Sequence, residues 1–452
     1  MPSAARSAIA PLYLLACLLL GGSAQGIWQN ALLQVAGLAI IGWAAAAETD
    51  EPLPGPAKPL LFLTIAAVAI VALQQLPLPP TIWAHGGRVP IANGFRLLGI
   101  SAPALPISLT PYSSLSALLC LIPPLAIFCA IVRLKASRQS WLAAALLAGT
   151  VGGIMLGALQ VGSAGKNSPW YLYPETNVGL GVGFFANANH MADLLVITLP
   201  FVAAIAAAGK SRNIQRYSAI LAILAAVTLV LIVGIALNGS LAGYALAVPV
   251  IAASALIIMP PSSQLRRWVA LAAALSVIAS VGALASSSIG GTKIGEETAS
   301  SVQSREQILT TTGNAIADFM PLGSGLGSFL NVYRLYESPD TVTNEYVIHA
   351  HNDYAELALE LGVPGIVLLL VFAGWWGIAV WAVWRKGEGG PFARAASIAS
   401  AAVLVHSLVD FPLRTAAISA CFAMCLALLA DRQAPPRKEA EDLRPTRHLV
   451  IR

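Results

Sequence analysis

The stretch SAILAILAAVTLVLIVGIAL, residues 218–237, decides the fold class of this chain. It contains no charged residue, and its length is about what a helix rising 1.5 Å per residue needs to cross roughly 30 Å of hydrocarbon. Similar apolar runs recur from the N-terminus to residue 430. A membrane barrel is not expected, because its strands would alternate apolar with polar residues. The sequence therefore predicts an all-α, polytopic membrane protein.

The composition of the 452 residues agrees with this interpretation. Hydrophobic residues make up 57% of the chain and charged residues 10%, whereas an ordinary soluble domain carries roughly 25% charged residues. This balance excludes a water-soluble fold. The five cysteines fall within apolar runs, where they behave as small apolar residues, so neither a disulfide framework nor a zinc motif is predicted. No basic stripe interleaved with aromatic residues indicates nucleic acid binding.

We predict about twelve transmembrane helices from the apolar runs. A cleaved signal peptide is disfavoured, because only Arg6 precedes the first run and further runs follow it. The approximate ranges are 8–24, 27–47, 59–79, 113–133, 141–160, 191–208, 218–237, 240–260, 268–288, 363–384, 395–411 and 415–430.

Basic residues in the connections predict the orientation. Lys and Arg resist translocation and stay cytoplasmic, and a cytoplasmic N-terminus leaves most of the 26 Lys and Arg residues on that side. Both termini are then cytoplasmic, and the connections 80–112, 161–190 and 289–362 are extracytoplasmic. Long ordered loops usually carry function. We expect one membrane domain over 1–430, with a large periplasmic loop at 289–362, and a disordered cytoplasmic tail at 431–452.

Ionisable residues inside the predicted spans are few and lie near one leaflet. Asp193, His406 and Asp410 are the main ones, and such groups are costly in hydrocarbon and usually functional. By the predicted topology all three lie toward the outer surface. None marks a substrate path at the membrane midplane, as in many secondary transporters.

Four segments carry a family resemblance, and they follow one another between about residues 180 and 430. The strongest is HAHNDYAELALELGVPG at 349–365, which enters an apolar run. The others are GFFANANHMAD at 183–193, Ser304-Arg305 followed by PLGSGLGSF at 321–329, and HSLVDFPLR at 406–414. Together they resemble the O-antigen ligase and polymerase superfamily.

The resemblance implies a membrane glycosyltransferase without metal or cofactor. Members of this superfamily transfer a glycan from undecaprenyl pyrophosphate to a hydroxyl acceptor, at the periplasmic surface of the bacterial inner membrane. The acceptor is lipid A-core sugar in ligases, the next repeat unit of a growing glycan chain in polymerases, and a protein in related oligosaccharyltransferases. The implied process is the synthesis of lipopolysaccharide or exopolysaccharide, with membrane lipid and lipid-linked glycan as partners.

His351 is the predicted catalytic base. Imidazole titrates near neutral pH, and His351 matches the family's essential histidine. His349 is its candidate orienting partner. Two alternatives stay open: the histidines cap or pack the following helix, or His-x-His-x-Asp binds a metal, although no third segment supplies ligands.

Arg305 is the predicted ligand of the departing pyrophosphate, because a guanidinium makes bidentate, charge-assisted contacts with phosphate oxygens. The resemblance implies a second arginine after a Ser at the outer edge of a middle span, but here Leu241 follows Ser240. One phosphate charge is then left unmatched unless Lys166, Lys293, Arg334 or Arg414 takes the place of that arginine. The expected reaction is one direct displacement at the anomeric carbon, with inversion.

The remaining candidates would bind substrate, with structural alternatives beside them. Asn187, Asn189 and His190 either contact sugar and phosphate or cap the next helix. The glycines of 323–327 shape a turn rather than bind phosphate, and Asp410 with Arg414 is a candidate ion pair. The predicted substrate-binding residues are His349, Asn352, Tyr354, Asn187, Asn189, His190, Arg334 and Arg414.

Ligase and polymerase remain close alternatives, and the missing arginine at Leu241 slightly favours a polymerase. Two alternatives come from other functional classes: a transporter of lipid-linked sugars and a non-catalytic subunit of an assembly machine. The large extracytoplasmic loop and the absence of midplane charges stand against transport.

Overall fold

The computed structural model describes residues 3–24, 27–48, 52–163, 168–174, 176–210, 213–260, 263–286, 293–339, 342 and 346–432. The side chains of 281, 283–286 and 293–304 lie outside the described set, as do Lys166 and almost all of the predicted tail at 431–452. Within the described ranges the regular elements are helices, and Leu78 and Leu105 form one isolated bridge. The all-α prediction is confirmed.

Each predicted span coincides with a helix or a helix pair. The helices are α1 (Ser3–Leu20), α2 (Trp28–Ala46), α3 (Ala57–Gln74), α6 (Pro111–Leu119) with α7 (Ile122–Val132), α8 (Gln139–Gly162), α9 (Ala188–Ala208), α10 (Ile214–Asn238), α11 (Leu241–Ile258), α12 (Gln264–Ser286), α15 (Asp353–Trp381), α16 (Gly390–His406) and α17 (Ala416–Ala430). Eight helical stretches in the described residues are long and apolar enough to cross a membrane, and α1 and α17 are shorter apolar helices. The protein is therefore a polytopic membrane protein.

Helix α9 lies at the centre of the bundle. It is buried almost throughout and packs against α8, α10, α11, α16 and α17. Small residues permit this close packing. A Cβ added at Gly243 of α11 would lie 2.8 Å from Cβ of Ala192, and one at Gly234 of α10 would lie 2.8 Å from Cγ1 of Ile154.

The junction of α10 and α11 is a tight turn on the same face as the start of α9. Gly239 ends α10 with φ +74°, a left-handed conformation that glycine adopts without strain. Ser240 then caps α11 by accepting a hydrogen bond from the Gly243 amide at 3.1 Å. The side-chain amide of Asn238 donates to the carbonyls of Gly181 and Ala188, which fixes the turn against the start of α9.

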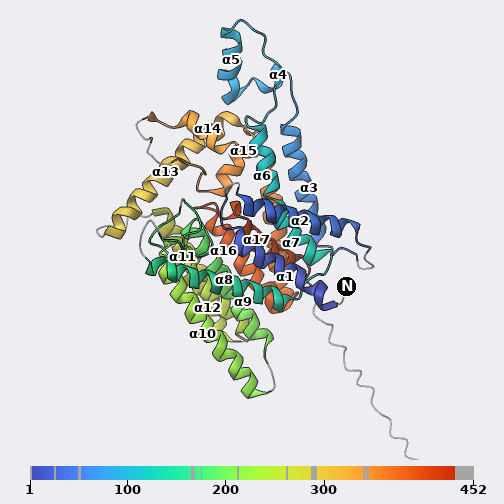
Figure 1. Cartoon of the computed structure of the whole chain (residues 1–452), viewed down its shortest axis with the longest axis vertical. Coiled ribbons are helices and arrows are strands. Elements are labelled where there is room, and N and C mark those ends of the chain that lie inside the picture. Colours follow the sequence, from blue (N-terminus) through green and yellow to red (C-terminus); the bar gives the residue numbers. More distant parts are fainter. Residues whose placement is uncertain are drawn as a thin grey trace, which may run out of the picture.

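A smaller assembly covers one end of the bundle. It comprises α4 (Pro80–Trp83), η1 (Gly86–Arg88), α5 (Val89–Leu97), α13 (Lys293–Phe319) and α14 (Phe329–Tyr336). Figure 1 shows α4 and α5 beyond the bundle, with α13 and α14 beside the start of α15. The assembly has its own apolar core, made by Ile308, Ala315, Phe319, Phe329, Val332, Tyr333, Ala350 and Leu359.

Helix α15 is bent at Gly362, where φ is +63° and ψ is −147°. The bend is close to residue 363, where the sequence predicted the span to begin. It separates Asp353–Leu361, which packs with the smaller assembly, from the long apolar part of the helix. The Val363 amide donates to the carbonyl of Pro321 at 2.9 Å, so the bend is tied to the loop after α13.

The predicted span at 395–411 is wrong at its C-terminal end. Helix α16 ends at His406, and the chain then turns, so Asp410 lies in the connection to α17. Pro412 cannot donate a helical hydrogen bond, and the carboxylate of Asp410 accepts the amide hydrogen of Phe411 at 2.9 Å. Both features favour the turn over another helical turn.

Candidate active site

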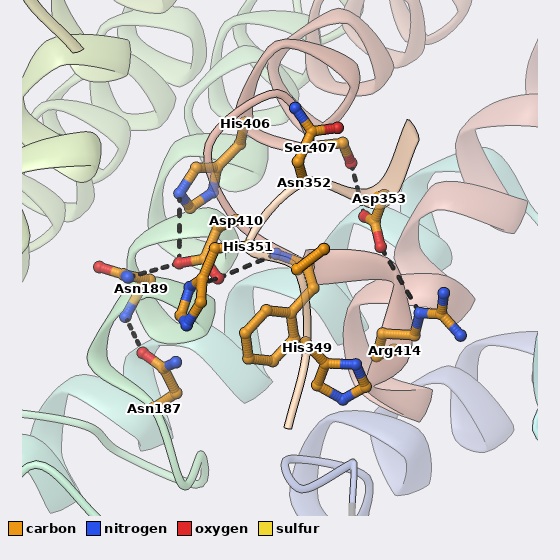
Figure 2. Close-up of polar contacts among 12 residues, drawn as sticks. Asn187, Asn189, His349, His351, Asn352, Asp353, His406, Ser407, Asp410 and Arg414 are labelled. Carbon is orange, nitrogen blue, oxygen red and sulfur yellow. Dashed lines mark hydrogen bonds and ion pairs between the residues drawn. The ribbon is translucent and has the colours of Figure 1, made fainter. Parts of the chain in front are cut away.

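Four segments far apart in the sequence meet at one face of the bundle. They are the start of α9, the turn between α10 and α11, residues 349–353 before α15, and residues 406–414 between α16 and α17 (Figure 2). They lie at the starts of α9, α11, α15 and α17 and at the ends of α10 and α16. Because successive helices run in opposite directions, these ends lie on the same side of the bundle. The predicted candidates of three of the four motifs therefore lie together.

His351 lies at the centre of this face. Its backbone has φ +49°, an uncommon conformation for a residue with a Cβ, although histidine is enriched among those that adopt it. Its Nδ1 lies 3.4 Å from Oδ1 of Asp410, an ion-pair distance without hydrogen-bond geometry. The His351 side chain is 28% exposed, whereas that of Asp410 is fully buried. A partly accessible imidazole is thus oriented by a buried carboxylate.

Asp410 is held from several sides. The side-chain amide of Asn189 donates to its Oδ2 at 2.5 Å, and the hydroxyl of Ser240 donates to Oδ1 of Asn189 at 2.7 Å. Burial raises the pKa of the Asp410 carboxyl, but the neighbouring imidazoles, His351 first among them, lower this pKa by more than burial raises it. The pKa of Asp410 therefore lies well below the ordinary value of 3.8. Asp410 is therefore a carboxylate throughout the physiological range.

Two more ionisable residues lie behind Asp410. Nδ1 of His406 is 2.6 Å from Oδ1 of Asp193, and Nε2 of His406 is 3.9 Å from Oδ2 of Asp410. All three side chains are buried. We call Asp193, His351, His406 and Asp410 the histidine cluster. The three costly residues singled out in the sequence thus belong to one network with the predicted base.

A second set of charges surrounds Arg414. Its Nη2 lies 3.0 Å from Oε1 of Glu356 and 3.6 Å from Oε2 of Glu360, and its Nε lies 3.6 Å from Oδ1 of Asp353. Burial lowers the pKa of Arg414, but these carboxylates raise it by more, so the guanidinium is always charged. We call Asp353, Glu356, Glu360 and Arg414 the arginine cluster.

The predicted ion pair of Asp410 with Arg414 is therefore wrong. Residues 407–415 do not continue helix α16, so residues four apart do not share a face. The Asp410 carboxylate belongs to the histidine cluster and the Arg414 guanidinium to the arginine cluster.

His349 is not the orienting partner of His351. Its Nδ1 lies 2.9 Å from Oε1 of Glu356, and the other Glu356 oxygen accepts the Ala350 amide hydrogen. The two histidines instead share a neighbour, because the ring of Phe411 lies 4.3 Å from that of His349 and 5.0 Å from that of His351. Phe411 therefore lies between the two clusters.

Three predicted substrate-binding residues have structural partners. Asn352 caps α15 by accepting from the amides of Tyr354 and Ala355, and its own amide donates to the Leu408 carbonyl. The Tyr354 hydroxyl donates to the Leu404 carbonyl at 2.6 Å. Asn187 accepts the Asn189 amide hydrogen and caps α9. For Asn187 the geometry favours the capping alternative, Asn352 is also a helix cap, and the Tyr354 hydroxyl is bonded to the backbone of α16.

His190 is placed behind the accessible surface. It is 3% exposed, and its ring lies 5.3 Å from that of Phe411 and 6.5 Å from that of Phe185. The structure therefore places it behind the site rather than on its open side.

A family comparison bears on this geometry. Residues 224–370 match the family model described as O-Antigen ligase. This match supports the resemblance to the O-antigen ligase superfamily. The match runs from α10 into α15 and includes Ser240, Arg305 and His351. A search of the curated proteins finds no match.

The cations predicted to bind pyrophosphate differ in their surroundings. Arg305 on α13 is half-buried, its charge acts on His406, and no ion pair joins it to a described residue. Arg334 is exposed, and its guanidinium lies 4.8 Å from the centre of the Tyr346 ring. Leu241 is 45% exposed at the start of α11. The side chain of Lys293 lies outside the described set, as Lys166 does.

The glycine-rich loop at 323–327 is a packed turn. The amides of Ser324 and Gly325 donate to the carbonyls of Leu359 and Glu360. A Cβ at Gly323 would lie 2.4 Å from the carbonyl oxygen of Glu360. Backbone amides used in this way are not free to bind phosphate, which agrees with the predicted shaping role.

Arg88 is a buried residue that the sequence interpretation missed. Its Nη2 donates to the carbonyls of Ile107 and Gly323, and its guanidinium lies 5.1 Å from the centre of the Phe319 ring. Burial lowers its pKa to about 10. The signal was hidden because a loop arginine next to glycines looks exposed. Arg88 joins the segment around η1 to the glycine-rich loop.

Two apolar grooves lie between helices of the bundle. One, with a cavity of about 290 Å³, lies between α11, α12, α15 and α16, and its lining includes Leu246, Val277 and Val405, next to His406. The other, of about 380 Å³, lies between α3, α7, α15 and α17, and ends at Leu413 beside Arg414. Val405 and Leu413 are the chain neighbours of His406 and Arg414, and no residue of either cluster lines a groove.

Among the described residues, no group of three or more His, Cys, Asp and Glu side chains is placed to hold a metal ion. The His-x-His-x-Asp alternative fails because its side chains diverge: His349 contacts Glu356, His351 contacts Asp410, and Asp353 contacts Arg414.

Proposed function

We propose that this protein transfers a glycan from undecaprenyl pyrophosphate to a hydroxyl acceptor, as a lipid A-core ligase, on the periplasmic face of the bacterial inner membrane. The observation that carries the proposal is the pairing of a partly exposed imidazole, His351, with the buried carboxylate of Asp410. A base oriented in this way is what deprotonation of a sugar hydroxyl requires.

The proposed reaction is a single displacement without a metal. The acceptor oxygen attacks the anomeric carbon as its proton passes to His351, and the bond from that carbon to the pyrophosphate oxygen breaks. The electron pair leaves with undecaprenyl pyrophosphate, whose charge Arg305 stabilises. Attack opposite the leaving group inverts the anomeric configuration.

Arg305 is the best cation for the leaving group because of its charge surroundings. Arg414 lies among three carboxylates, so an approaching pyrophosphate would meet net negative charge there. Arg305 has no described carboxylate partner and acts on the same cluster as the base. It therefore supplies positive charge where the pyrophosphate would leave.

The groove beside His406 suits the hydrocarbon chain of the donor. Only the pyrophosphate separates the reacting carbon from the lipid, so the donor chain must enter the membrane next to the base. The lining of this groove includes Val405, the chain neighbour of His406, on which the charge of Arg305 acts. Its apolar lining favours burial of a hydrocarbon chain.

The distribution of basic residues supports the proposed orientation. On the face opposite the site, Arg6 donates to the Leu134 carbonyl, Lys135 pairs with Asp431, and Arg432 pairs with Glu388. Basic residues stay cytoplasmic, so the site would face the periplasm, with both termini in the cytoplasm.

A polymerase that joins lipid-linked repeat units is the alternative within the class. Leu241 favours it, because the family's second arginine is missing beside Ser240. Polymerase activity would act in O-antigen or exopolysaccharide synthesis, with a glycan chain as acceptor and the same base.

The test is a transfer assay with the purified protein and an undecaprenyl-pyrophosphate oligosaccharide, with EDTA present. One tube receives lipid A-core and another receives the donor alone. Transfer to core supports a ligase, and chain growth without core supports a polymerase. If a folded protein gives neither product, with or without divalent cations, the transferase proposal is wrong. Movement of a fluorescent lipid-linked sugar across proteoliposomes would then indicate a transporter, and no movement an assembly subunit.

A further inference from the structure

The predicted base is backed by a layer of buried groups with unmet hydrogen-bonding capacity. Among the described residues, Nδ1 of His351, Nε2 of His406, Nε2 of His190 and Oδ2 of Asp193 are buried atoms without a hydrogen-bond partner. Buried polar groups are almost always paired. Four such atoms near one carboxylate, Asp410, indicate a region adapted to changes in charge rather than to stability.

The surroundings of His406 indicate its protonation state. Its Nδ1 lies 2.6 Å from one Asp193 oxygen, and its Nε2 lies 3.9 Å from an Asp410 oxygen. A neutral imidazole has a lone pair on one nitrogen, and here either nitrogen would direct that lone pair at a carboxylate. The ring with hydrogens on both nitrogens is the form that suits both neighbours.

The charges of this layer then nearly cancel. Asp193 and Asp410 carry two negative charges, and His406 carries one positive charge, which leaves one negative charge beside His351. Uptake of one proton by His351 brings the cluster to neutrality. Neutrality matters because an unbalanced charge is expensive in a buried setting.

Other charged or titratable groups reach the cluster from each neighbouring element. Helix α9 contributes His190, and α13 contributes Arg305, whose charge acts on His406. His349 lies across Phe411, where Glu356 is its partner. Asn189 and Ser240 complete the surroundings as uncharged groups. None of these supplies a second carboxylate to His406.

We infer that the buried residues Asp193 and His406 are a charge-compensated positioning pair, in which each residue offsets the effect of the other on how tightly His351 holds its proton during transfer. The inference rests on the proposed function. The two residues do not touch substrate, and they act through Asp410. Their charges cancel, so that the cluster keeps only the negative charge of Asp410 in the resting state.

The experiment compares the pH dependence of transfer in four proteins: wild type, His406→Gln, Asp193→Asn and the double variant. His406→Gln leaves two carboxylates without their cation, so the acid limb should move up by about one pH unit. Asp193→Asn leaves His406 with Asp410 alone, and the limb should move down. The double variant again has one negative charge, and its limb should return to the wild-type position.

A merely structural role predicts another result. The double variant would then be at least as impaired as the worse single variant, and the acid limb would stay in place in all four proteins. Either finding overturns the inference. Thr198→Val is the matched control, because Thr198 is a buried, uncharged hydroxyl of α9 bonded to Thr150 at 2.8 Å. It should leave the limb where it is.

A second measurement separates this inference from the proposed function. Diethyl pyrocarbonate modifies neutral imidazole, and mass spectrometry of the peptide that contains His351 gives the pH midpoint of its reaction without any activity. The pH midpoint of His351 modification is expected to move in the same direction as the acid limb in each of the four proteins. If transfer is absent but the midpoints move as stated, the proposed function fails and the charge coupling stands. Unmoved midpoints overturn the coupling even in an active enzyme.

Discussion

The histidine cluster and the arginine cluster lie on two sides of Phe411, and they treat buried charge differently. Glu356 of the arginine cluster contacts Arg414, His349 and a backbone amide. The histidine cluster has as many ionisable groups, but three of its polar atoms lack a hydrogen-bond partner. In the arginine cluster one such atom, Oε2 of Glu360, lacks a partner, so the difference is three atoms against one.

This difference indicates a division of roles. The paired charges hold the first turns of α15 against the segment before α17, because separating them leaves a buried carboxylate unpaired. Loosely bonded groups with one accessible imidazole are typical of reactive sites, where proton affinity is set by neighbours. We therefore expect variants of the histidine cluster to lower activity first and variants of the arginine cluster to lower stability first.

The largest expected effect is on transfer in His351→Gln. Loss of a general base costs about 10²- to 10⁴-fold in rate, and the expected loss lies in that range with the thermal midpoint nearly unchanged. His349→Gln is the matched control, because His349 contacts the same Phe411 ring but faces the arginine cluster. Initial rates and thermal unfolding of both variants in detergent make the test. If His349→Gln loses more rate than His351→Gln, the base is assigned to the wrong histidine.

Glu356→Gln should lower the stability of the protein more than its activity. Removal of one partner of a buried ion pair costs about 3–5 kcal/mol, and Glu356 is 1% exposed. We expect a lower midpoint in chemical unfolding, with the transfer rate per folded molecule largely kept. Asp318→Asn is the control, since Asp318 is an exposed carboxylate bonded to the Tyr336 hydroxyl at 2.8 Å. Equal stability of the two variants would show that the arginine cluster does not hold the fold.

The elements of the fold could be predicted from the sequence because the membrane imposes a length on each apolar run. The twelve predicted ranges all fall on helices. Two of them, 59–79 and 395–411, run five residues past the helix ends at Gln74 and His406, and at the second Pro412 and Asp410 favour a turn. The bend at Gly362 inside α15 was not predicted. Its cause is packing against Pro321 and Gly323, which are distant in the sequence.

The site could be predicted as a set of residues but not as a set of contacts. The motifs lie at helix ends on one side, so their convergence follows from the alternation of spans. Partner choice depends on turn geometry, which spacing alone does not reveal. Asp410 and Arg414 are four residues apart without sharing a helix face, and His349 and His351, two apart, face different carboxylates. The position of Phe411 between them could not be predicted from the sequence, because an aromatic residue beside a proline looks like an ordinary packing residue.

A smaller effect is expected in the groove that ends at Val405. Val277→Trp would fill the groove at a partly exposed position, so KM for a donor with the full prenyl chain should rise several-fold, with kcat nearly kept. A donor with a short prenyl chain should show less change. Ile278→Trp is the control, because Ile278 is the neighbouring residue, is 68% exposed, and does not line the groove. Equal KM values for the two variants would exclude the groove as the donor site.

The smallest expected effect on the transfer rate is that of Arg334→Gln, which tests whether Arg305 or Arg334 is the cation that binds the leaving group. Arg334 is exposed and contacts the ring of Tyr346, itself 76% exposed, and such a cation–π contact contributes about 0.5–1 kcal/mol. The transfer rate should change by less than about twofold, because solvent and salt screen an exposed charge. Arg305→Gln is the informative partner, since Arg305 is half-buried and its charge acts on His406. It should lose far more rate at the same donor concentration. If Arg334→Gln loses the rate and Arg305→Gln keeps it, the pyrophosphate lies over α14, and the histidine cluster would then have to act without a neighbouring cation.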